Sequence, residues 1–258
     1  MNRPAPLVPN PIQAPGTSLQ QWQGSRRLRS VPTITREALL EPGRRLVIVA
    51  PHPDDEVLMC GGLLASLASS PADLLLISVT DGEGSHPHST LWPAARLRAV
   101  RPRESTEALA RLGIDCRHLP WLRLGLADAQ VAASETSLVR QLRDILRPGD
   151  QLLTTWRHDA HCDHEAVGRA CAAAAQDCHA TLLEVPVWAW HWASPEDPRL
   201  PWARARKLPL APHAIAAKRR AIEAHASQLA ADPSTGATAI LPPAVLERLL
   251  QPFELFFR

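Results

Sequence analysis

Short apolar runs alternate along the chain with longer stretches that place an apolar residue every three or four positions. The short runs are typical of strands buried on both faces, and the longer stretches of amphipathic helices. The expected strands are residues 46–50, 73–80, 114–119, 151–156, 181–188 and, at a sheet edge, 253–257. The expected helices are residues 55–68, 93–112, 134–146, 164–178, 213–229 and 243–250. This alternation predicts an α/β fold, a Rossmann-like three-layer α/β/α domain with a mostly parallel sheet.

The first 35 residues do not follow this pattern. They are rich in proline, with glutamine and arginine between the prolines Pro4, Pro6, Pro9, Pro11, Pro15 and Pro32. A segment of this composition buries too little surface to order by itself, although Leu19, Trp22 and Leu28 could lie along the body. We therefore predict a partly ordered N-terminal arm over residues 1–35 and a single domain over 36–258. Removal of the arm is expected to leave the core folded.

Composition excludes several functional classes. The net charge is +2 and the basic residues are scattered, which argues against a nucleic-acid partner. Hydrophobic residues make up 45% of the chain but form no run of membrane-spanning length, so no stable membrane insertion is expected. The five cysteines include no Cys-x-x-Cys pair, and no secretory leader is apparent. These features predict a cytoplasmic protein and leave open whether it forms a homo-oligomer.

Acidic and imidazole side chains gather where the first expected strand ends. Pro51 and Pro53 forbid continuation of that strand, so His52 lies at its carboxyl end. Asp54, Asp55 and Glu56 follow as the acidic first turn of a helix. Because ligands of open α/β sheets bind at the carboxyl ends of strands, these side chains are candidates for a site rather than a simple helix cap.

A second cluster follows the strand predicted at 151–156. It reads His158-Asp-Ala-His-Cys-Asp-His-Glu and ends at residue 165. Two such turns in one sheet can face each other. Two imidazoles and a carboxylate with one open position are typical of catalytic zinc, and iron(II) tolerates the same set.

The two motifs together resemble those of the PIG-L/LmbE-like family of zinc-dependent N-acetylglucosaminyl deacetylases. The resemblance is carried by His52-Pro-Asp-Asp-Glu with Cys60-Gly-Gly, and by His161-Cys-Asp-His-Glu about a hundred residues later. Weaker similarity, such as Lys218 with His225, Ser227 and Gln228, extends it over most of residues 45–230. Cys162 departs from the family, which more often has proline there.

The resemblance implies a role for each residue of the two motifs. His52, Asp55 and His164 would bind the metal, and Asp54 would be the general base. His161, as an imidazolium, would stabilise the oxyanion or protonate the leaving amine, and Asp163 would orient it. Arg101 would contact substrate, whereas the local alternative is an ion pair with Glu104. From the residues alone, His158 or Asp159 could equally replace His164 as ligand.

These roles predict a metal-dependent amidohydrolase that deacetylates a small N-acyl amine. The resemblance favours an N-acetyl amino sugar or its glycoside. The alternatives are an amidase of the same fold acting on a thiol conjugate or an acylated lipid, or a metal-stabilised binding module without turnover. If the strand pattern persists past residue 187, Trp188, Trp190 and Trp192 share one face, for core packing or for stacking on a sugar. Their role, the exact substrate and the physiological metal are not fixed by the sequence.

Overall fold

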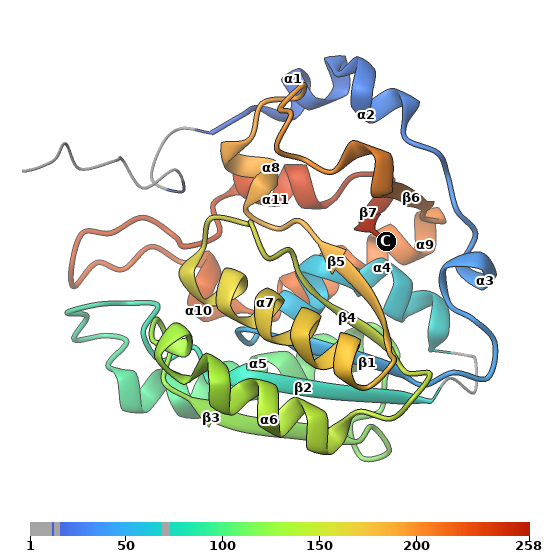
Figure 1. The fold of residues 1–258 in the computed structure, drawn as a ribbon. Helices are drawn as coiled ribbons and strands as arrows, with labels where there is room; N and C mark the ends of the chain where they lie inside the picture. The colour runs from blue at the N-terminus through green and yellow to red at the C-terminus, as the bar shows by residue number, and fades with distance from the viewer. Residues whose placement is uncertain (1–11, 13–15, 69–72) are drawn as a thin grey trace, which may run out of the picture.

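A seven-stranded sheet organises the chain in a computed structural model that describes residue 12 and residues 16–68 and 73–258. The strand order is β3-β2-β1-β4-β5-β7-β6 (Figure 1). The strands are β1 (Leu46–Ala50), β2 (Leu74–Thr80), β3 (Trp121–Leu126), β4 (Gln151–Thr155), β5 (Thr181–Val185), β6 (Ala205–Pro209) and β7 (Phe253–Phe257). The strands β1 to β5 pair in parallel, whereas β7 pairs antiparallel with both of its neighbours, β5 and β6. The expected mostly parallel sheet is confirmed.

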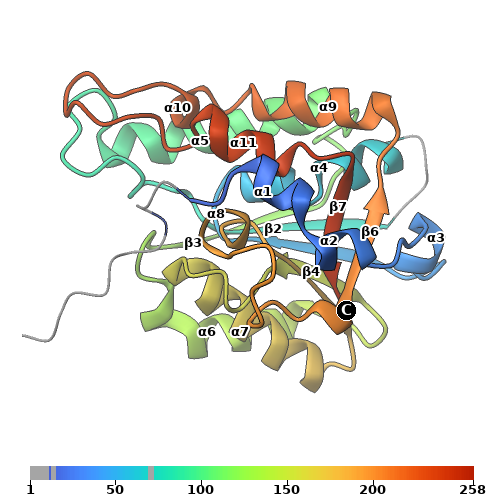
Figure 2. The same cartoon turned by 90° about the horizontal axis from the view of Figure 1, so that it is seen from above.

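Helices cover both faces of this sheet, as the view from above shows (Figure 2). One layer contains α4 (Asp55–Leu67), α5 (Ala94–Arg111) and α9 (Pro212–Ile222), and the other α6 (Glu135–Ile145) and α7 (Cys162–Asp177). Alternate residues of β1 supply the two cores: Ile48 packs on the first side and Val49 on the second. The three-layer prediction is therefore confirmed. No helix within the described ranges is both long enough and apolar enough to cross a membrane.

Short helices complete the fold. They are α1 (Leu19–Gly24), α2 (Arg26–Ser30), α3 (Arg36–Leu39), η1 (Val131–Ser134), α8 (Ala189–Trp192), η2 (Trp202–Arg204), α10 (Ala226–Leu229) and α11 (Pro243–Leu249). Figure 1 places α1, α8 and α11 close together on one side of the molecule.

Two of the strand predictions are wrong. Residues 114–119 form no strand; the neighbour of β2 is β3, in a stretch where we expected neither a strand nor a helix. As an edge strand, β3 is only half covered, so it lacks the continuous apolar run of an inner strand. Ile114 instead packs into the core from a turn. The C-terminal strand is also not at the edge, because β6 pairs along its outer side.

The strand pattern does not persist past residue 187, so the three tryptophans do not share one face. After β5 the chain turns into the short helix α8, where Trp190 packs on Trp22 and Trp188 lies beside His161. The cause is remote in sequence: the Asp159 carboxylate accepts the backbone N–H groups of residues 187, 188 and 189, at 2.8–3.1 Å. A carboxylate that accepts the free N–H groups of a helix N-terminus stabilises a helix at that point.

Part of the predicted arm packs against the domain. Trp22 is 1% exposed, lies edge-on to Trp190 at 4.9 Å between ring centroids, and donates from Nε1 to the Trp190 carbonyl. Thr33 forms a β-bridge with Lys207 at the outer strand. The proline-rich stretch at residues 1–11 and 13–15 lies outside the described residues. The division of the chain at residue 35 stays a prediction, but residues 16–35 contribute to the core.

Replacement of Trp22 tests this contribution. Trp22→Ala is expected to lower the free energy of unfolding by about 3–5 kcal/mol, because a buried aromatic side chain is lost and a cavity remains. Urea unfolding measures the change. Gln20→Ala, on the exposed face of the same helix, is the control and should stay within about 0.5 kcal/mol of wild type. Equal stability of the two variants would show that the arm is dispensable for folding.

The buried imidazole of His225 couples folding to pH. It lies just before α10, is 0% exposed, and neither ring nitrogen has a hydrogen-bond partner among the described residues. Burial, with a smaller contribution from the Arg101 charge, lowers the pKa of His225 to about 3. The native protein therefore holds this side chain neutral over a pH range in which an unfolded histidine, with a pKa of about 6.5, takes up a proton.

The free energy of unfolding should consequently fall as the pH drops from about 6.5 toward 3, since the unfolded state binds one more proton there. The contribution of His225 to this slope is about 1.4 kcal/mol per pH unit at most. Urea titrations between pH 7 and pH 4 should show a shallower dependence for His225→Gln than for wild type. Identical slopes would mean that His225 is protonated in the native state.

Candidate metal centre

The two predicted clusters meet at the point where the strand order reverses. The chain leaves β1 for β2 and β3 on one side, and returns with β4 on the other side of β1. β1 and β4 pair in parallel, so the turns that follow them are neighbours at one edge of the sheet. This reversal is where open α/β sheets bind ligands. The expectation that the two turns face each other is confirmed.

One carboxylate oxygen bridges the imidazoles of the two motifs. Asp55 Oδ2 lies 3.1 Å from His52 Nδ1 and 3.3 Å from His164 Nε2. Donor atoms bound to one tetrahedral zinc lie about 3.3 Å apart. Asp55 also accepts the backbone N–H of His52 at 3.0 Å, which fixes the carboxylate on the tight turn. The chemistry of this set suits a divalent metal ion. His52, His161 and His164 also form a group whose ligand atoms all lie within 4.8 Å of one another.

Two carboxylates on the other side of His52 form an alternative set. Asp163 Oδ2 lies 3.1 Å and Asp128 Oδ1 3.3 Å from His52 Nε2, and these three residues also lie close enough to bind a metal. The Asp163 carboxylate accepts backbone N–H groups from Ala129 and Val131. Asp128 accepts the N–H of Gly84. These aspartates are already hydrogen-bonded, which suits residues that orient a metal-binding histidine.

The placement of Asp163 differs from our expectation. Its carboxylate contacts His52, and only its backbone N–H reaches His161, where it donates to Nδ1 at 3.3 Å. The backbone bond leaves His161 Nε2 as the protonated nitrogen. The imidazole thus presents an N–H toward the pocket without carrying a charge.

His164 is oriented by a third aspartate. Asp159 Oδ2 lies 2.8 Å from His164 Nδ1, and the same carboxylate accepts the backbone N–H groups that begin α8. His164 Nε2 is therefore directed at Asp55. Asp159, one of the two alternative ligands, thus hydrogen-bonds His164. The other, His158, packs its ring against Trp156, with 5.5 Å between ring centroids. His86 and His88, in the loop after β2, belong to no candidate metal cluster among the described residues.

Asp54 is turned away from Asp55 by a backbone conformation that non-glycine residues rarely adopt, with φ of 143°. Its Oδ2 accepts from Arg101 Nη2 at 2.9 Å, and the same guanidinium donates to the carbonyls of Pro53 and Gly82. Gly82 has φ of +66°, and a Cβ there would lie 2.0 Å from Arg101. The expected alternative, an Arg101–Glu104 ion pair, is not formed, because Glu104 accepts from Ser227.

The pKa values show that the centre favours positive charge between Asp55 and its histidines. Burial lowers the pKa of His164, but Asp55 and Asp159 outweigh it and raise that pKa to about 9. For Asp55, His164 and His52 outweigh burial and hold the pKa well below its usual range. A metal ion would replace the protons that these imidazoles attract.

Two ionisable side chains beside Asp55 and its histidines, Asp54 and His161, are more readily held in their neutral forms. Burial raises the pKa of Asp54 to about 7, although the Arg101 charge lowers it. Burial, and then the neighbouring His164 and His52, lower the pKa of His161 to about 2. Burial and the neighbouring histidines thus favour the neutral form of His161 in this structure, and its role as an imidazolium stays a prediction.

The metal centre opens into a cavity of about 680 Å³. Residues of both motifs line it, as do the apolar side chains of Ile240, Leu241 and Val245. Asp128, which sequence reasoning missed, also borders it. No local pattern could have singled out Asp128, since a lone aspartate in the loop after β3 resembles any solvated loop residue.

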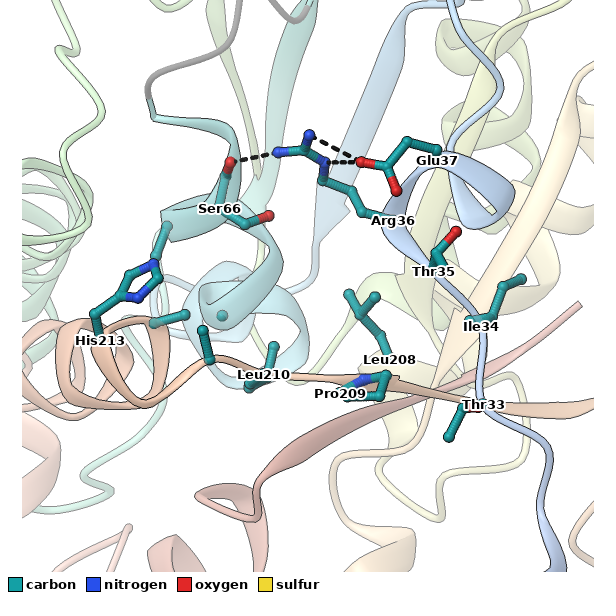
Figure 3. A pocket seen from close by; sticks show the side chains of 14 residues that line it. Thr33, Ile34, Thr35, Arg36, Glu37, Ser66, Leu208, Pro209, Leu210 and His213 are labelled. Atoms are coloured by element: carbon teal, nitrogen blue, oxygen red, sulfur yellow. Dashed lines mark hydrogen bonds and ion pairs between the residues drawn. The ribbon is translucent and has the colours of Figure 1, made fainter.

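A second cavity, of about 590 Å³, lies near the other end of α4 (Figure 3). Its charged side chains Arg36 and Glu37 pair with each other at 2.9–3.0 Å, and Arg36 also donates to the Ser66 carbonyl. The remaining lining is largely apolar, including Ile34, Leu208 and Leu210. Of these two cavities, only the first is lined by the candidate metal-binding and catalytic residues.

Comparison with known proteins matches this geometry. The PIG-L family model, described as GlcNAc-PI de-N-acetylase, matches residues 47–175. A 1D-myo-inositol 2-acetamido-2-deoxy-alpha-D-glucopyranoside deacetylase from Mycobacterium sp. (strain JLS) is 29% identical over 189 residues, 64% of this chain and 60% of that protein. The 2'-N-acetylparomamine deacetylase of Streptomyces fradiae is 36% identical over 98 residues, 38% of this chain and 34% of that protein.

A solved structure shares the fold. The zinc-inhibited form of the teicoplanin deacetylase Orf2 superposes with a TM-score of 0.58 at 18% identity, over 83% of this chain and 97% of that one. This chain spans about 60% of the length of the mycobacterial relatives it matches first. The matched region begins in β1 and ends in α7, so it contains both motifs. The chain belongs to the PIG-L family, described as GlcNAc-PI de-N-acetylases.

Proposed function

We propose that the chain is a zinc-dependent hydrolase that removes an acetyl or other acyl group from an amine. The observation that carries the proposal is the Asp55 carboxylate shared between His52 and His164, with the separate carboxylate of Asp54 beside it. Two histidines and one aspartate would hold the metal. A site that only stabilises the fold needs no further carboxylate next to its ligands.

In this proposal each remaining residue acts on the substrate amide. A bound divalent metal would polarise the acyl carbonyl and lower the pKa of a water molecule. Asp54 would take the proton of the attacking water as general base and pass it to the departing amine, and Arg101 holds that carboxylate in position. The Nε2 hydrogen of His161 would donate to the developing oxyanion. Asp163 and Asp159 would fix the rings of His52 and His164.

The substrate of the proposal is an N-acetyl amino sugar or a glycoside of one. Two relatives are deacetylases whose names specify acetylated amino-sugar compounds. Trp188 supports this class, because its ring lies nearly parallel to that of His161, 6.5 Å away, and borders the cavity. Aromatic rings in such places stack on sugar faces. The apolar side chains that line the same cavity keep the second candidate, an acylated lipid or thiol conjugate, in the test.

The proposed division of labour predicts different results for neighbouring aspartates. Asp55→Ala, His52→Ala and His164→Ala should lose metal and activity together. Asp54→Asn should retain metal while kcat falls by about 10²- to 10⁴-fold, the usual contribution of a general base. Metal content per folded protein, with kcat on a responsive amide, measures both. A folded Asp54→Asn protein that binds no metal would contradict the assignment.

The substrate class is tested by amine release from a panel of acylated compounds. N-acetylglucosamine or its glycosides should yield free amine with the zinc-loaded protein, and a chelator should abolish the release until metal is restored. Acylated sugar lipids, thiol conjugates and non-sugar amides complete the panel. Release from a non-sugar amide alone would reject the sugar assignment and keep the hydrolase, whereas sugar binding without release would favour a binding module.

A further inference from the structure

Besides Arg101, a second buried arginine borders the metal-centre cavity, and it forms no ion pair with an acidic side chain of the described residues. Arg101 and Arg248 are each 3% exposed, and both border this cavity. Arg101 is neutralised by Asp54. Arg248, on α11, instead contacts the Thr17 carbonyl at 2.6 Å and His191 Nδ1 at 2.9 Å, and its Nε has no partner within the described part of the chain.

The charge of Arg248 is therefore not explained by its contacts within the protein. A neutral donor would serve the carbonyl and the imidazole equally well. Taking a guanidinium out of water without an ion-pair partner carries a free-energy cost. Burial lowers the pKa of Arg248, and the nearby Glu247 charge offsets only part of that effect. A guanidinium of this kind beside a ligand cavity is suited to an anionic oxygen group on the ligand.

Aromatic side chains connect Arg248 to the metal centre along one wall. The Trp188 ring lies 6.5 Å from His161 on one side and 6.1 Å from His191 on the other, between ring centroids. His191 then contacts Arg248. An amino sugar stacked on Trp188 would have its acyl amide at His161 and a substituent directed at Arg248.

We infer that the substrate of this chain carries a carboxylate or phosphate group, which Arg248 binds at the end of the cavity away from the metal. The inference rests on the proposed function and adds a feature of the substrate to it. Arg248 is a specificity-determining residue in this account. The group lies on the part of the substrate that remains attached to the amine product.

Two glycosides of matched shape isolate the effect of substrate charge on kcat/KM. The carboxymethyl and carbamoylmethyl glycosides of N-acetylglucosamine differ in charge and hardly in shape. The zinc-loaded protein should show a kcat/KM for the carboxylate about 10- to 100-fold above that for the amide, the usual difference for a charge-assisted hydrogen bond. N-acetylglucosamine 1-phosphate, compared with the free sugar, tests phosphate in the same way.

Three variants test whether Arg248 causes this preference for the charged substrate. Arg248→Gln, which keeps a donor for Thr17, should reduce the ratio to near one, and Arg248→Lys should restore part of it. Arg219→Met, an exposed arginine on α9, is the control and should keep the ratio. Thermal unfolding verifies that each variant folds. A ratio near one in wild type, or an unchanged ratio in Arg248→Gln, would overturn the inference.

Calorimetry with the two amine products separates this inference from the proposed function. The carboxymethyl glycoside of glucosamine should bind more tightly than its carbamoylmethyl counterpart, and Arg248→Gln should remove the difference. If this pattern appears while no compound of the panel releases amine, the hydrolase proposal fails and the anion site stands. If sugars are deacetylated but the products bind equally, the anion site fails and the hydrolase stands.

Discussion

The Asp55 carboxylate, placed between His52 and His164, is the contact on which the rest of the site depends. It joins the turn after β1 to the first turn of α7, so it requires these two strand ends to be neighbours. Repulsion among the surrounding carboxylates is offset by the histidines, and the raised pKa of His164 records that attraction. A metal ion at this point would strengthen the same arrangement, because it supplies positive charge where the fold already favours it.

The supporting aspartates extend this constraint into remote loops. Asp163 binds the N–H groups at residues 129 and 131, and Asp159 binds those at residues 187–189. Each carboxylate therefore orients a histidine and also fixes the backbone of a segment that borders the cavity. The shape of the cavity and the geometry of the metal centre are thus set by the same side chains, which links substrate fit to metal binding.

Charge is distributed unevenly around the cavity. The acidic cluster and its histidines lie at one end, and Arg101 is neutralised there by Asp54. Arg248 is held at another part of the wall by the N-terminal segment through Thr17. That segment, which composition alone describes as an arm, is packed by Trp22 onto α8 and so helps to position Trp188 and His191 near Arg248. The described residues of the arm therefore pack against the cavity wall.

The sequence by itself determined the features that depend on near neighbours along the chain. Apolar runs identified the inner parallel strands, prolines ended β1 at His52, and the two histidine–aspartate motifs located the site, because strand ends in a parallel sheet meet at one edge.

Tertiary structure decided everything that depends on which remote groups meet. Asp128 reaches His52 from a loop without any motif, and Asp163 supports His52 rather than His161. The Asp159 carboxylate stabilises a helix at residues 189–192. The edge strand β3 is only half covered, so its sequence lacks the apolar run by which the inner strands were predicted. Periodicity reports whether a residue is buried, whereas the partner of a buried charge is fixed only when the chain has folded.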